Sequence, residues 1–205
     1  MRHIKVLMVL VALIVSFFLA VEVDAGGRKQ KIPAPVPQTG QTDFYYSGDD
    51  GDLQAGVPWP VPRFVDNANG TVTDKLTGLI WLKDGNCFGP RTWADALDVS
   101  STLASGVCNL TDGSVAGDWR LPNIKELQSL IHYGVHDPAL PNTNGTEQWV
   151  EGDPFTGVLP SGYYWASSTV AGSGDAYTLY TGAGFVGQLS KLHFGYFVWP
   201  VRGGN

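Results

Sequence analysis

Two histidines stand at a metal-binding spacing. His132 and His136 are four residues apart, which is the separation of two zinc ligands on one face of a helix, and Asp137 follows them. Gly134 interrupts the helix between the histidines, however, and no glutamate follows His132 as a hydrolytic zinc site requires. A histidine at a helix end and a second one in a loop are the simpler interpretation, so we predict neither a metal site nor a cofactor.

A hydrolytic triad is equally incomplete. Ser167 or Ser168, His193 and Asp175 supply the residue types of a Ser-His-Asp set, but the sequence has no Gly-x-Ser-x-Gly motif to expose the nucleophile. We therefore predict a protein that is not an enzyme.

Calcium has one candidate site. The stretch "SGDDGDLQ" places Asp49, Asp50 and Asp52 together, but the glutamate at the twelfth position of a helix–loop–helix calcium site is missing, which favours a solvated loop. Calcium-dependent lectins hold ion and sugar with an acidic or amide residue before Pro-Asn or Pro-Asp. Here leucine takes that place in both 121–123 and 140–142, so calcium-dependent sugar binding is disfavoured.

The residues best suited to ligand binding lie in the C-terminal half. Residues 135–162 are rich in Pro, Gly and Asn and have no periodicity, and such a stretch within a domain is usually functional or disordered. A planar ring beside hydrogen-bonding groups suits recognition of carbohydrate or of a cell-surface protein. We predict six ligand-binding residues in this loop and on the late strands, with ordinary packing as the alternative for each: Trp149, Glu151, Asp153, Tyr177, Tyr180 and His193.

The first 25 residues have the three regions of a secretory signal peptide. Arg2 and Lys5 precede an apolar run over 6–21, and Val23 and Ala25 have the spacing of a cleavage site. The alternative is an uncleaved membrane anchor. We predict an exported protein, periplasmic or extracellular, with no stable membrane span after cleavage.

The charge balance restricts the partners. A net charge of −6 is unsuited to nucleic acid, whose phosphates require clustered Lys and Arg, and it disfavours heparin-like polyanions for the same reason.

The chain has two cysteines, Cys87 and Cys108. In an exported protein an isolated pair most simply forms one disulfide, and there is no Cys-x-x-Cys to suggest a redox role. The loop that this bond closes contributes roughly 3 kcal/mol in the chain-entropy model.

The periodicity predicts an α+β domain over 61–205, preceded by a Pro- and Gly-rich linker and preamble over 26–60. Tight turns at Asn69-Gly70 and Thr77-Gly78 predict a three-stranded meander. Two amphipathic helices follow, capped by Thr92 and Asn123 and ending at Gly106 and Gly134. After the irregular loop, four segments predict strands: 163–170, 176–181, 184–189 and 196–202.

This order, with "FVDNANGTVTDKLTGLIWLKD", "DWRLPNIKELQSLI", "YYWASST" and "VWPVRGG", resembles the Lcl C-terminal domain family of exported bacterial proteins. The resemblance covers Phe64 to Gly204. It implies a C-type-lectin-like fold, in which two helices pack on small antiparallel sheets and the long loop and late strands form a binding surface. It also implies binding rather than catalysis. Some relatives are adhesion modules for sulfated polysaccharides, and one relative is trimeric, so a homo-oligomer is open here.

The segment "WRLPN" also has a more distant resemblance to the enzymes that generate formylglycine in sulfatases. Their chemistry requires reactive cysteines near the end of the chain, whereas residues 163–205 contain none. We therefore interpret Arg120 and its neighbours as scaffold. The function that we predict is a ligand-binding module, and the alternative is a structural or assembly domain of the cell envelope. An oxidase of the formylglycine-generating type ranks below both, because Cys87 and Cys108 could serve it only if they were reduced.

Overall fold

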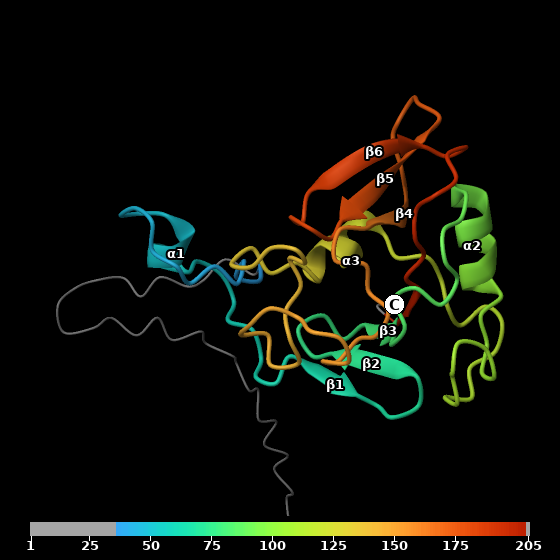
Figure 1. Ribbon diagram of the computed structural model, residues 1–205, viewed down its shortest axis with the longest axis horizontal. Coiled ribbons are helices and arrows are strands. Elements are labelled where there is room, and N and C mark those ends of the chain that lie inside the picture. The colour runs from blue at the N-terminus through green and yellow to red at the C-terminus, as the bar shows by residue number, and fades with distance from the viewer. Residues whose placement is uncertain (1–35, 204–205) are drawn as a thin grey trace, which may run out of the picture. The chain divides into compact units, whose positions relative to one another are not determined.

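The structure is a computed structural model that describes residues 36–203, and the predicted signal peptide and the first residues of the linker lie outside this range. Within it, no helix is long and apolar enough to cross a bilayer. The fold is α+β, with few helices and two antiparallel sheets, as the periodicity predicted (Figure 1).

The first sheet contains the predicted meander. Its strands lie in the order β1–β2–β3–β7, and their bounds are Phe64–Asp66, Thr71–Asp74, Ile80–Leu82 and Val201–Arg202. Gly70 and Gly78 have φ values of 84° and 74°, a region that favours glycine in the two turns. Because β7 pairs with β3, the last strand of the chain lies in the same sheet as the first.

Both helices begin where the caps predicted. Helix α2 (Trp93–Ser101) starts after Thr92, and α3 (Ile124–Ser129) starts after Asn123, whose side chain forms a complete capping box with Glu126. Both end four or five residues earlier than expected. After α3 the chain turns at Leu130, and the His132 N–H donates to the Ala139 carbonyl. Burial of Leu130 and Ile131 in this turn therefore stabilises the structure more than continuation of the helix to Gly134 would.

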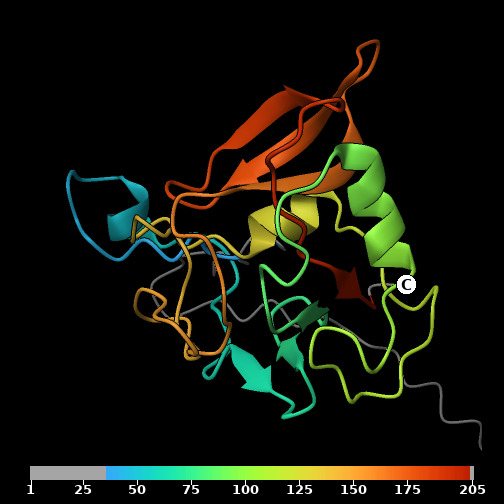
Figure 2. The same ribbon diagram turned by 45° about the vertical axis from the view of Figure 1, so that its right-hand side comes forward.

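The second sheet has the order β4–β5–β6, with bounds Tyr163–Thr169, Asp175–Tyr180 and Val186–Ser190. Helix α3 lies between the two sheets in both views (Figures 1 and 2). Tyr164 and Leu179 pair on the face that joins the core, and Tyr163 and Tyr180 pair on the opposite face. Four tryptophans are buried, of which Trp165 lies in a smaller second cluster and the others lie in the main core: Trp81, Trp119, Trp165 and Trp199.

Residues 36–60, the described part of the predicted linker and preamble, have structure of their own. They include a short helix, α1 (Asp50–Leu53), and pack on the domain in one compact unit. The indole of Trp59 lies 4.2 Å from the Arg63 guanidinium and makes an edge contact with the His132 ring. An aromatic side chain that covers a buried cation and a buried imidazole holds this segment against the domain.

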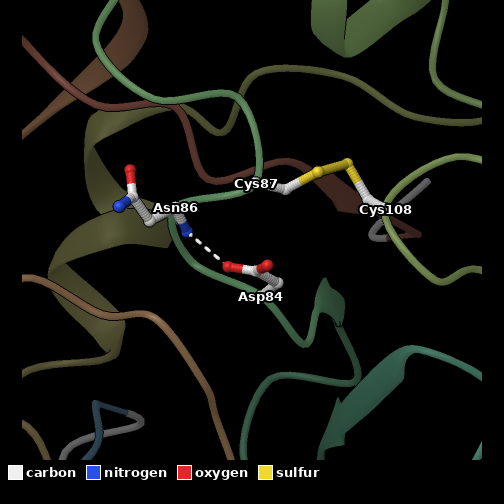
Figure 3. The surroundings of a disulfide bond; sticks show 4 residues. All are labelled: Asp84, Asn86, Cys87 and Cys108. Atoms are coloured by element: carbon white, nitrogen blue, oxygen red, sulfur yellow. Dashed lines mark hydrogen bonds between the residues drawn. A yellow bond between two sulfur atoms is a disulfide. The ribbon is translucent and has the colours of Figure 1, made fainter.

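The predicted disulfide is present. Figure 3 shows Cys87, in the segment after β3, bonded to Cys108, in the loop after α2. The Asn86 N–H donates to the Asp84 carboxylate at 2.9 Å beside the bond, which fixes the turn that carries Cys87.

Candidate functional site

An aromatic cluster lies where β4 starts and β5 ends. We define the aromatic cluster as Tyr163, Tyr180, Phe185, His193 and Tyr196. Antiparallel register places Tyr163 directly opposite Tyr180, with ring centroids 4.8 Å apart. The Phe185 ring lies 4.9 Å from Tyr180, and the His193 ring stacks on Tyr196 at 4.6 Å. Two of the six predicted ligand-binding residues, Tyr180 and His193, thus belong to one group.

Local backbone contacts position these rings. In the turn between β5 and β6 the Tyr180 N–H donates to the Phe185 carbonyl, and a Cβ at Gly182 would lie only 2.6 Å from the Tyr180 ring. Tyr196 is fixed by the Arg91 N–H, which donates to its carbonyl, and by the buried Trp165 ring, 5.0 Å away. The rings therefore rest on core residues and on glycine backbone.

The cluster is accessible from solvent. Phe185 is 48% exposed, His193 is exposed, and the three tyrosines are half-buried. Within residues 36–203, the side-chain oxygens of Tyr163, Tyr180 and Tyr196 have no hydrogen-bond partner. The surface therefore combines aromatic faces with hydroxyl and imidazole groups that are free to bond a ligand.

The tryptophan of the irregular loop over 135–162 is buried, unlike the rings of the aromatic cluster. Trp149 is only 6% exposed, and its indole N–H donates to the Phe155 carbonyl at 3.2 Å. The Trp149 ring thus lies in the core, which is the alternative of ordinary packing, because an apolar ring that can satisfy its N–H internally gains by burial.

The two acidic residues of this loop, Glu151 and Asp153, accept hydrogen bonds from backbone N–H groups. The Glu151 carboxylate accepts from the Gly157 N–H at 2.9 Å, and the Asp153 carboxylate accepts from the N–H and hydroxyl of Thr143. Tyr177 lies on the opposite face of β5 from Tyr180, packed against the main core, so it is not part of the aromatic cluster.

The structure does not assemble a metal site from the candidate residues of the sequence analysis. His132 is buried and its Nδ1 accepts from the Gly134 N–H, whereas His136 is exposed. Among residues 36–203, no three His, Cys, Asp or Glu side chains are placed to hold a metal ion. The Asp49 carboxylate caps α1 by accepting from the Asp52 N–H and also accepts from the Tyr45 and Tyr46 N–H groups, and these bonds lower its pKa.

The triad residues are also separate. The Ser168 hydroxyl accepts from the Ile124 N–H and His193 stacks on Tyr196, while no hydrogen bond among the described residues joins Ser168, His193 and Asp175.

A groove of about 610 Å³ lies between α2 and the "WRLPN" junction, and its lining includes Asp98, Arg120 and Ser167. The Arg120 guanidinium bonds both carboxylate oxygens of Glu126, at 2.7 and 2.6 Å, and the Gly203 carbonyl. Burial raises the pKa of Glu126, but the bonds from Arg120 and the Asn123 N–H outweigh it and lower the pKa overall. Arg120 therefore ties the helix cap to the end of the chain, as the scaffold interpretation expected.

A model of the Lcl C-terminal domain family matches residues 70–202, which is more than half of the chain and includes α2, α3 and the strands from β2 to β7. The chain belongs to this family. A search of curated proteins finds no match. In this Lcl C-terminal domain the aromatic cluster lies on the late strands, within the matched region.

Three members of the cluster were not predicted from the sequence. Tyr163, Phe185 and Tyr196 have no motif. Strand register brings Tyr163 to Tyr180, the β5–β6 turn places Phe185, and the segment after β6 carries Tyr196. The one available signal was alternation in "YYWASST", which separates Tyr163 from the core-facing Tyr164.

Proposed function

We propose that the protein is an exported, non-enzymatic binding module with a C-type-lectin-like fold, and that its aromatic cluster recognises carbohydrate. The observation that carries the proposal is the set of exposed and half-buried rings whose hydroxyls are unused within the described chain. Sugar rings offer apolar C–H faces and hydroxyl edges, which match aromatic faces and phenol or imidazole groups.

The charge supports a neutral ligand. The aromatic cluster contains no carboxylate or guanidinium, and the net charge of −6 disfavours long polyanions. Three acidic side chains that were candidates for a site, Asp49, Glu151 and Asp153, accept hydrogen bonds from backbone N–H groups instead. We therefore propose recognition that needs no calcium.

The test is a glycan-array screen at physiological ionic strength, run with calcium and again with a chelator. The proposal predicts specific signal that survives the chelator and disappears in Tyr180→Ala. Tyr177→Ala is the matched control, because it removes the same side chain from the opposite face of the same strand. Signal that requires calcium, or silence in both conditions, contradicts the proposal.

A further inference from the structure

The segment before α1 exposes three consecutive aromatic side chains. Phe44, Tyr45 and Tyr46 are 64, 75 and 79% exposed, and we call them the exposed aromatic segment. In Figures 1 and 2 the loop that carries them and α1 project from the domain, away from both sheets. Single exposed apolar residues are ordinary on a protein surface, whereas a contiguous apolar patch marks a surface that contacts a partner.

Hydrogen bonds fix the backbone of this segment against α1. The Asp49 carboxylate accepts from the Tyr45 and Tyr46 N–H groups at 2.9 and 3.1 Å, and from the Asp52 N–H at 2.8 Å. Gly51 of α1 is buried, and a Cβ there would overlap the Asp43 carbonyl oxygen. The rings are therefore held in position before a partner arrives, which reduces the entropy lost on binding.

The charge around the exposed aromatic segment is entirely negative. Residues 36–62 contain no lysine, arginine or histidine, and they contain four aspartates. The ion pairs among residues 36–203 involve other carboxylates, so none of them neutralises this group. Carboxylates attract cationic groups and repel phosphate, sulfate and anionic membranes. The four residues are Asp43, Asp49, Asp50 and Asp52.

We propose that the exposed aromatic segment is a docking surface for a partner protein whose contacting segment is rich in arginine. A guanidinium group is planar, stacks on aromatic faces and bonds carboxylates through parallel N–H groups. The hydrogen bonds from Tyr45 and Tyr46 to Asp49 place rings and a carboxylate side by side, so one surface offers both kinds of contact.

The same charges argue against carbohydrate at this position. A neutral sugar would stack on the rings but would gain nothing from the four aspartates, and a sulfated one would be repelled. The aromatic cluster on the late strands has no carboxylate, so the two surfaces differ in the chemistry that they offer. The arginine-rich partner is thus an additional ligand, independent of the carbohydrate.

The experiment titrates the purified protein with hexa-arginine by calorimetry at low and at physiological ionic strength. We expect binding that weakens as salt rises and that is tighter for hexa-arginine than for hexa-lysine. Loss of one exposed ring that contacts a cation changes Kd about two- to fivefold, so the double variant Tyr45→Ala, Tyr46→Ala should bind roughly fivefold weaker or more. Alanine keeps both N–H groups that bond Asp49, so the backbone of the segment is preserved.

Matched variants separate this surface from general properties of the protein. Phe194→Ala removes a ring that is 61% exposed outside the segment and should leave Kd within about twofold of wild type. Asp43→Asn should weaken binding, whereas Glu147→Gln removes an exposed carboxylate elsewhere and should not. Tyr180→Ala should bind hexa-arginine like wild type, so failure of carbohydrate recognition leaves this test unaffected.

Three results would overturn the inference: no binding of hexa-arginine at low salt, equal affinity in wild type and the double variant, or equal weakening in Asp43→Asn and Glu147→Gln. A glycan-array signal that the double variant loses would also overturn it, because the segment would then bind carbohydrate.

Discussion

The buried ion pair between Arg63 and Asp74 is the most sensitive point of the fold. Both side chains are fully buried, and the Asp74 carboxylate accepts from Arg63 Nε at 3.3 Å and Nη2 at 3.1 Å. It also accepts from the Leu76 N–H and the Thr77 hydroxyl. Asp74→Asn replaces the carboxylate with a neutral amide and leaves the guanidinium charge uncompensated in the core.

Breaking one partner of a buried pair typically costs about 3–5 kcal/mol. For a domain of this size each kcal/mol lowers the melting temperature by about 2–4 °C, so we expect a drop of roughly 10 °C. Asp66→Asn is the matched control, because Asp66 pairs with Lys83 in the same sheet at 2.7 Å but both side chains are partly exposed. That variant should lose less than about 1 kcal/mol.

The assay is urea unfolding followed by tryptophan fluorescence, with calorimetry for the melting temperature. If Asp74→Asn and Asp66→Asn lowered the free energy of unfolding equally, burial of the Arg63–Asp74 pair would not be the reason for its contribution to stability.

Two further predictions concern the disulfide and a buried histidine. Replacing Cys87 and Cys108 with alanine opens a cross-link with a sequence separation of 21 residues and should cost roughly 3 kcal/mol in urea unfolding; no change in the midpoint would contradict this. Burial, aided by the charge of Arg63, lowers the pKa of His132 below its ordinary 6.5. The folded protein therefore binds this proton at lower pH than the unfolded chain, and stability is lost as the pH falls below about 6.5. His132→Gln should flatten the fall in midpoint between pH 7.5 and 5.5, while the exposed His136→Gln should reproduce the wild-type slope.

Local signals in the sequence predicted much of the fold. The caps at Thr92 and Asn123 and the turns at Gly70 and Gly78 act through neighbouring residues, and all four are where the pattern placed them. The disulfide followed from a single cysteine pair, which leaves no choice of connectivity.

The candidate site depended on information that local patterns lack. Tyr163 meets Tyr180 only because β4 and β5 pair in one register, and a shift of one residue would send either ring to the other face. Trp149 was assigned to a binding loop because the loop is irregular, yet an irregular segment can bury a large ring when its N–H finds a carbonyl. The packing of residues 36–60 depends on Trp59 reaching Arg63, a tertiary contact that the prolines do not signal.

Titration calorimetry with the glycan that gives the strongest array signal measures whether the aromatic cluster binds carbohydrate. Truncation of a tyrosine that dominates a binding site costs about 2 kcal/mol or more, and about 1.4 kcal/mol is a tenfold change in Kd. We predict at least a tenfold weaker Kd for Tyr180→Ala and a Kd within about twofold of wild type for Tyr177→Ala, each checked for native folding by circular dichroism. Equal affinity in wild type and Tyr180→Ala would contradict carbohydrate binding by the aromatic cluster.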